Sequence, residues 1–245
     1  MDTNSFVVTA DGSKTLYHPE IGEHYHSQHG AVQESKHVFV NTGLAYFLET
    51  QARESVSVLE VGLGTGLNFL LSAEFCIQKG ILLDYVGIEA YPLSTAIIAQ
   101  TGYDHYVSAP LWRTFLERYP DSWHSPQMLD ANCQLTAVHN EVQRYITDKR
   151  FDIVYFDAFA SARQPEMWTE ETLRHVTGFL KPGGIFVTYA ITGHLKRTLK
   201  ALGFAVEKAP GAPGKREMLR ATLSSVNGGA SHPDHVNGRG PIHQP

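Results

Sequence analysis

The chain has 245 residues and a formal net charge of −5, and 42% of its residues are hydrophobic. This length suits one α/β domain with additions and is short for two such domains. No apolar run approaches the roughly 18 residues of a membrane span, and the N-terminal MDTNSFVV lacks the basic and apolar regions of a signal peptide. The composition therefore predicts a cytoplasmic protein that makes no contact with a membrane.

Cysteine and histidine give no sign of a metal site. Neither of the two cysteines, Cys76 and Cys133, has a CxxC partner, and both are expected to be buried thiols. The 13 histidines are scattered and form no HExxH motif. We therefore expect no metal.

Charge is spread unevenly along the chain. Residues 1–190 hold 12 Lys and Arg against 22 Asp and Glu, whereas residues 191–245 hold 8 against 3. A basic C-terminal quarter on an acidic protein is compatible with a polyanion docking on one face. A solvated helix face or an edge strand would give the same pattern.

In chain order, residues 1–20 predict a β-hairpin, because SFVVTA and KTLYHP flank an Asp11-Gly12 turn. The chain then becomes helical from about Ala31. This segment precedes the first strand of the main sheet, so it could fold over a ligand cleft as a lid that carries Tyr25, Ser27 and Glu34. The alternative for each of these three residues is a plain packing role. Residues 1–50 are thus predicted as hairpin and lid, 51–223 as the main domain, and 224–245 as a disordered tail.

Residues 55–68, SVSVLEVGLGTGLN, organise the main domain. A short apolar run is typical of a strand buried on both faces, and it leads into glycines at positions 62, 64 and 66. The LNFLLSAEF that follows has the apolar spacing of one helical face. Strand, glycine turn and helix open a doubly wound fold, in which a ligand lies beyond the carboxyl end of the first strand.

Two acidic residues indicate which ligand this turn binds. Glu60 precedes the first glycine, where a carboxylate would repel the phosphates of a dinucleotide but suits a cation such as S-adenosylmethionine. Glu89 ends the next strand, DYVGIE, where it could accept both ribose hydroxyls of a nucleoside. The alternative is that both are solvated strand ends beside an ordinary turn.

Beyond Glu89 the chain predicts a helix over LSTAIIAQT and a helical insertion between Tyr103 and Asp130. QLTAVH is the third predicted strand, and Asn140 just after it could reach an adenine ring. A helix is predicted from Glu141 to Thr147.

The fourth strand, Phe151 to Phe156, should lie beside the first, which places Asp157 at the methyl end of the cofactor. A carboxylate there could attract an amine and deprotonate it for attack on the methyl group. A turn or helix-capping aspartate is the alternative.

The rest of the domain predicts a helix from about Glu166 to Leu180, a fifth strand after KPGG, a helix ended by Gly203, and a hairpin of FAVEKA and EMLRATL. The predicted fold is α/β and doubly wound, with a mostly parallel seven-stranded sheet, helices on both faces, and an N-terminal hairpin extension.

Four motifs carry a family resemblance: EVGLGTGLN at 60–68, DAFASARQPEMW at 157–168, KPGG at 181–184 and GKREML at 214–219. Together they resemble the methyltransferase domain of MnmC-type tRNA modification enzymes, from about Tyr25 to Leu223. The resemblance implies a Rossmann-like class I methyltransferase fold. It also implies methyl transfer from S-adenosyl-L-methionine to the aminomethyl group of 5-aminomethyl-2-thiouridine at the tRNA wobble position.

Carried over by motif, the resemblance implies Asp157 as the catalytic carboxylate. It implies cofactor binding by Glu60, Gly62, Gly64, Thr65, Gly66, Asn68 and Glu89, joined by Asn140. It implies substrate binding by Phe159, Pro165, Met167 and Trp168, which would shape a pocket for the extruded uridine. Lys215 and Arg216 would lie near phosphate or the pocket entrance.

The chain departs from the fused enzymes because it lacks their FAD-dependent oxidoreductase half, so it is expected to methylate only. The loop before KREML carries GAPG instead of the family's usual aromatic and basic residues. Two other hypotheses stay open. One is a methyltransferase or aminopropyltransferase acting on a small free amine, and the other is a domain that binds tRNA without turnover.

Overall fold

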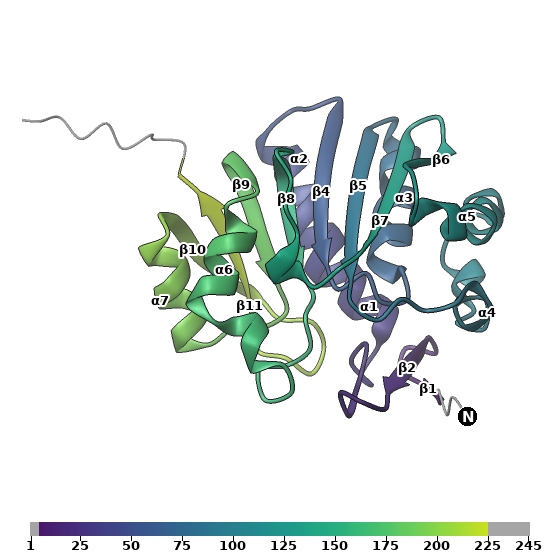
Figure 1. Ribbon diagram of the computed structural model, residues 1–245, viewed down its shortest axis with the longest axis horizontal. Helices are drawn as coiled ribbons and strands as arrows, with labels where there is room; N and C mark the ends of the chain where they lie inside the picture. Colours follow the sequence, from purple (N-terminus) through teal and green to yellow (C-terminus); the bar gives the residue numbers. More distant parts are fainter. Residues whose placement is uncertain (1–4, 225–245) are drawn as a thin grey trace, which may run out of the picture.

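A central eight-stranded sheet dominates the computed structural model, which describes residues 5–224 (Figure 1). The strand order is β10-β11-β9-β8-β4-β5-β7-β6. Five neighbouring strands are parallel, with β4 between β8 and β5, so the predicted doubly wound topology is confirmed. They are β4 (Ser55–Val61), β5 (Leu82–Glu89), β7 (Cys133–His139), β8 (Phe151–Phe156) and β9 (Leu180–Thr188).

The sheet has antiparallel strands at both edges. β10 (Phe204–Pro210) pairs with β11 (Glu217–Leu223), and β11 pairs with β9, which confirms the predicted C-terminal hairpin. The predicted count of seven strands misses β6 (Gln127–Asp130), which pairs with the other edge strand β7. β6 has four residues, a register shift and a half-exposed Met128, so it lacks the alternation that identifies a strand.

Helices cover both faces of the sheet, because buried strand residues alternate between two hydrophobic clusters. In β4, Val56 and Val58 pack on one side, whereas Leu59 and Val61 pack on the other. The first side is covered by α1 (Ala31–Ser35), the π-helical η1 (Lys36–Ala45), α2 (Tyr46–Thr50), α3 (Leu67–Lys79) and α5 (Ala109–Ser122); the second by α6 (Glu170–Thr177) and α7 (Gly193–Ala201).

Short helices replace some of the predicted longer ones. The prediction of a helix from Glu141 to Thr147 is wrong, since only the 3₁₀ turn η3 (Val142–Arg144) forms. Tyr145 instead adopts an extended backbone, packs its ring on Phe179 and accepts a hydrogen bond from His175. The remaining short elements are α4 (Thr95–Ile98), η2 (Tyr103–His105) and η4 (Pro165–Trp168).

The helix predicted from Glu166 to Leu180 begins only at Glu170, because the Thr169 side chain caps it by accepting from the N–H of Thr172.

The N-terminal hairpin is confirmed and belongs to a separate three-stranded sheet. It consists of β1 (Phe6–Val8), β2 (Lys14–His18) and β3 (Glu23–His24). In Figure 1, β1 and β2 lie below the lower edge of the large sheet, near the end of β5. The predicted tail falls, apart from Ser224, outside the described residues.

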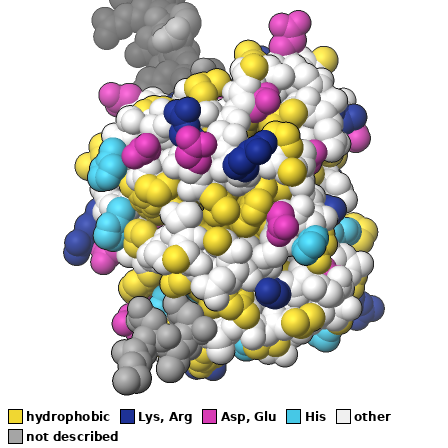
Figure 2. Space-filling model, turned by 90° about the vertical axis from the view of Figure 1, so that its right-hand side faces the viewer, with side chains coloured by type: hydrophobic (Ala, Val, Ile, Leu, Met, Phe, Trp, Pro, Cys, Tyr) yellow, Lys and Arg dark blue, Asp and Glu magenta, His cyan; other side chains and the backbone are white. Residues whose placement is uncertain are grey.

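The outer surface mixes charge types. On the face shown in Figure 2, basic side chains stand singly among acidic and apolar ones. No helix within residues 5–224 is both long and apolar enough to cross a membrane.

The buried carboxylate of Asp152 on β8 contacts residues of the neighbouring strands β4 and β9. Asp152 Oδ2 accepts hydrogen bonds from Ser57 N at 2.8 Å and Ser57 Oγ at 2.7 Å, and Lys181 Nζ lies 2.9 Å away. Asp152 is 8% exposed, so these donors replace water. The lysine of the KPGG motif therefore has a structural role here.

Asp152→Ala should lower the free energy of unfolding by about 2–4 kcal/mol, because it leaves the buried Ser57 N–H without an acceptor. Urea denaturation measures the loss. Asp152→Asn keeps one acceptor oxygen and should cost less, so equal losses in the two variants would contradict this account.

Candidate active site

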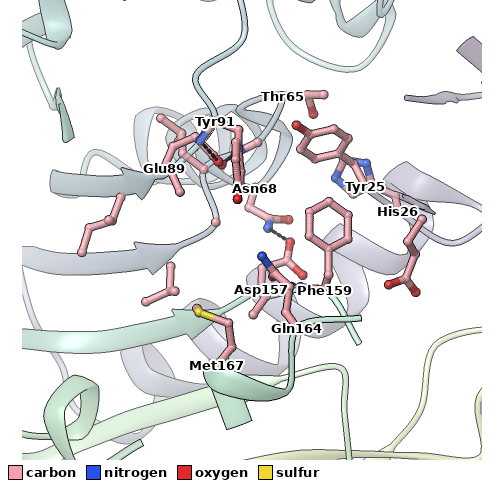
Figure 3. A pocket seen from close by; sticks show the side chains of 18 of the residues that line it. Tyr25, His26, Thr65, Asn68, Glu89, Tyr91, Asp157, Phe159, Gln164 and Met167 are labelled. Carbon is pink, nitrogen blue, oxygen red and sulfur yellow. Dashed lines mark hydrogen bonds between the residues drawn. The ribbon is translucent and has the colours of Figure 1, made fainter. Parts of the chain in front are cut away.

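A cavity of about 630 Å³ lies at the carboxyl ends of β4, β5 and β8. Its floor is the glycine loop between β4 and α3, and segment 23–28 together with Glu34 lines it from the N-terminal part of the chain. Its volume falls in the range of about 300–1,000 Å³ that small-molecule sites occupy. The strand ends where a ligand is expected and the segment expected to act as a lid therefore line one cavity (Figure 3).

Glycine is required at three positions of the loop. Gly62, Gly64 and Gly66 have φ of +89°, +51° and +78°. A Cβ on Gly62 would lie 2.5 Å from the carbonyl oxygen of Asp157, and one on Gly64 would lie 2.9 Å from Cδ1 of Tyr25. Because no side chain intervenes, the tip of β4 lies directly against the residue that follows β8.

Glu89 holds the glycine loop from the neighbouring strand. Its Oε2 accepts a hydrogen bond from Gly64 N, and its Oε1 accepts one from Tyr91 N, both at 2.8 Å. Burial raises the pKa of Glu89 despite these bonds. Asn140 N donates to the Glu89 carbonyl oxygen, and both residues line the cavity. The structure thus brings Gly64, Glu89 and Asn140 together as the sequence predicts.

Glu60 does not reach the cavity. It is fully buried, accepts hydrogen bonds from Asn68 Nδ2 and Tyr85 Oη at 2.8 Å, and lies behind the cavity wall. Burial raises its pKa well above the ordinary value. The same Asn68 amide nitrogen donates to Asp157 Oδ2 at 2.8 Å (Figure 3). Glu60 therefore orients Asn68 and, through it, Asp157.

Asp157 lines the cavity at the tip of β8, where its backbone N donates to Val61 O. Burial, together with the charge of Glu34, raises the pKa of Asp157 to about 7, although the hydrogen bond from Asn68 and the charge of Lys215 act in the opposite direction. A carboxyl group with this pKa can take up and release a proton near neutral pH.

An aromatic wall faces these acids. The rings of Tyr25 and Phe159 pack edge to face, 5.3 Å apart, and both line the cavity with Met167. Trp168 was expected in the base pocket, but it lies outside the cavity lining. Its Nε1 donates to the Phe159 carbonyl oxygen at 2.9 Å, and its ring packs on Phe156. Trp168 therefore fixes the backbone of Phe159.

Lys215 faces the cavity, and its expected place near phosphate or the pocket entrance stays a prediction. It lines the cavity, forms an ion pair with Glu34 and lies over the ring of Tyr189. Thr65 also lines the cavity, and its hydroxyl is hydrogen-bonded to Tyr103 Oη. Of the other predicted residues, Gly66, Pro165 and Arg216 do not line it.

Several cavity residues escaped the sequence analysis. Tyr189 follows the strand next to β8, so the topology could have pointed to it. Gln164 receives a hydrogen bond from Phe159 N within the DAFASARQPEMW motif. His26 is one of 13 histidines, and nothing in its sequence context singles it out. Burial lowers the pKa of His26 to about 4, and its Nδ1 is buried without a hydrogen-bond partner.

The cavity is strongly acidic. Six carboxylates and one lysine contribute to its lining, and this charge balance favours a cationic ligand. The six are Glu23, Glu34, Glu89, Glu141, Asp157 and Glu166.

Comparisons with known proteins agree with this geometry. Residues 107–224 match a family described as S-adenosyl-L-methionine-dependent methyltransferase. The chain is 29% identical over 220 residues to the tRNA 5-methylaminomethyl-2-thiouridine biosynthesis bifunctional protein MnmC of Magnetococcus marinus, covering 86% of this chain and 33% of that protein. The MnmC protein of Methylobacillus flagellatus is 30% identical over 226 residues, covering 85% and 34%.

The chain thus spans about a third of the length of these relatives. The crystal structure of MNMC2 from Aquifex aeolicus has the same fold, with a TM-score of 0.72 and 23% identity over 92% of this chain and 72% of that one. The chain is therefore similar to the S-adenosyl-L-methionine-dependent methyltransferases over residues 107–224 and is a homologue of the methyltransferase domain of the MnmC proteins.

Proposed function

We propose that this protein methylates the amine of 5-aminomethyl-2-thiouridine at the wobble position of tRNA, with S-adenosyl-L-methionine as the donor. The product would be the 5-methylaminomethyl-2-thiouridine that appears in the names of its relatives. The observation that carries the proposal is the position of Asp157, a proton-accepting carboxylate beside a glycine loop in an acidic cavity. This arrangement suits a cationic donor and an amine acceptor.

The residues of the cavity fit the donor. The glycine loop has no side chains that would keep a ligand away from its backbone. Glu89 accepts two hydrogen bonds from backbone N–H groups and has further lone pairs that can accept hydrogen bonds from ribose hydroxyls. Asn140 lies beside Glu89, where it can contact the base of the nucleoside. When bound, S-adenosyl-L-methionine supplies a methyl group on a positively charged sulfur, which the surrounding carboxylates favour.

Asp157 would act on the acceptor. An aminomethyl group carries a proton at neutral pH and has no free electron pair in that form. Asp157 can bind this ammonium and accept its proton, which leaves the nitrogen with the pair that attacks the methyl carbon. Asn68 would hold Asp157 in orientation during this transfer, because it donates to Asp157 Oδ2.

The aromatic wall would bind the base. A wobble uridine that leaves its stack can lie against Tyr25 and Phe159, with Met167 completing the apolar surface. For the phosphates, Lys196, Arg197 and Lys200 of α7 form no ion pair within the described residues. Residues 189–192 join the carboxyl end of β9 to α7, so the helix begins near the cavity end of the sheet, where its basic side chains would contact tRNA.

A small free amine is the second candidate acceptor. The excess of carboxylates in the cavity lining repels phosphate and attracts any protonated amine, whether or not it belongs to a nucleic acid.

Glu89→Gln should weaken S-adenosyl-L-methionine binding at least about tenfold, because a neutral amide replaces a charged acceptor of two hydroxyls. Isothermal titration calorimetry measures the dissociation constant. Glu171→Gln, on the exposed surface of α6, is the matched control and should bind normally. Equal affinity in Glu89→Gln and wild type would remove Glu89 from the site.

Asp157→Asn should bind the donor within about threefold of wild type and lose methyl transfer by about 10²–10⁴-fold, the usual contribution of a general base. Single-turnover assays with labelled donor measure the rate. If the variant kept more than a tenth of the wild-type rate, Asp157 would not be the proton acceptor.

The acceptor itself can be identified with tRNA that carries 5-aminomethyl-2-thiouridine. After incubation with labelled donor, nucleoside mass spectrometry should find one added methyl on this nucleoside. Parallel reactions contain the free nucleoside and small polyamines. Methylation of the small amines with none on tRNA would reject the proposed substrate and support the second candidate.

A further inference from the structure

Glu34 and Lys215 form an ion pair in the cavity lining, although they are far apart in the sequence. Glu34 lies on α1, and Lys215 lies in the loop between β10 and β11. Lys215 Nζ contacts Glu34 Oε1 at 2.5 Å, and Glu34 Oε2 accepts a hydrogen bond from Ser27 N at 3.0 Å. The Glu34 side chain is only 10% exposed, so water screens the pair weakly. The pair therefore joins the N-terminal segment to the C-terminal hairpin.

Tyr189 connects the ion pair to the backbone next to Asp157. Lys215 Nζ lies 4.0 Å from the centroid of the Tyr189 ring, and Tyr189 Oη donates to the carbonyl oxygen of Ala158 at 2.9 Å. Ala158 follows Asp157 directly in the chain, and Glu34, Lys215 and Tyr189 all line the same cavity as Asp157. Two opposite charges thus face one carboxylate.

We propose that Glu34 and Lys215 are positioning residues that act on the reaction through Asp157, an inference that rests on the proposed amine methylation. With Asp157 ionised, the three groups carry a net charge of −1, which one protonated amine neutralises. When the N–H bond of that ammonium breaks, the proton forms an O–H bond on Asp157 and the nitrogen keeps the electron pair. Lys215 keeps Asp157 ionised before binding, and Glu34 favours its protonation afterwards.

Other titratable groups also surround Asp157. Glu60 and Tyr85 lie behind it, Glu89 lies at the neighbouring strand tip, and Tyr189 lies beside it. Burial raises the pKa of Glu60, Tyr85 and Tyr189, so the two tyrosines stay protonated and neutral near pH 7. Glu23 also lines the cavity, near Tyr189. Among residues 5–224, Lys215 is the one Lys or Arg that lines the cavity.

The two halves of the pair should shift the pKa of Asp157 in opposite directions. Glu34 raises it and Lys215 lowers it, so Glu34→Gln should lower the pKa and Lys215→Met should raise it, each by about 0.5–1 unit. Lys215→Arg keeps the charge and should restore the wild-type value. A purely structural role would change both variants alike, because each breaks the same contact.

The test is a pH titration of the Asp157 carboxyl carbon by NMR in protein labelled with ¹³C-aspartate and free of donor, with Asp157→Asn assigning the signal. Lys208→Met is the matched control, since Lys208 forms an exposed ion pair with Glu217 on the same hairpin. Activity requires ionised Asp157, so the rise of kcat/KM with pH should move to lower pH in Glu34→Gln and to higher pH in Lys215→Met.

Shifts in the same direction, or no shift, would overturn the inference. If Lys215→Met does not fold, Glu34→Gln alone decides, because a downward shift is required. Opposite pKa shifts in a protein that never methylates tRNA would support the pair's action on Asp157 and reject the proposed substrate.

Discussion

The close approach of Gly62 to the backbone of Asp157 is the constraint on which the site depends. With a Cβ on residue 62, the tips of β4 and β8 would have to move apart. Their contact places the glycine loop and Asp157 in one cavity and lets a single amide, Asn68, donate to both Glu60 and Asp157. The glycine loop and Asp157, to which the proposed function assigns the donor and the acceptor, are thus parts of one arrangement.

Burial gives this arrangement its chemistry. The pKa values of Glu60, Glu89 and Asp157 are all raised because these acids lie in a low-dielectric interior, and their mutual repulsion adds to the effect. Binding of a cation in such a cavity is favourable, because the cation offsets the repulsion among the acidic side chains. A sulfonium donor and an ammonium acceptor are such cations, whereas the phosphates of a tRNA must find their partners outside the cavity.

The sequence predicted the parts of the site that depend on local spacing. Gly62, Gly64, Glu89 and Asp157 each lie at a strand end or in the turn after it, and parallel strands bring those ends together. Glu60 points to the same side of β4 as Val56 and Val58, because side chains alternate along a strand. The prediction that Glu60 contacts the ligand did not take this alternation into account. The Glu34–Lys215 pair is separated by 181 residues, so no local pattern can reveal it. The same holds for Trp168, whose role depends on which way its ring turns.

The most direct test of the account is a crystal structure of the protein with S-adenosylhomocysteine. The account predicts the ribose hydroxyls on Glu89, the amino acid part along the glycine loop, and the sulfur on the side of the cavity that carries Asp157. A ligand bound outside this cavity, or Asp157 turned away from the sulfur, would contradict it.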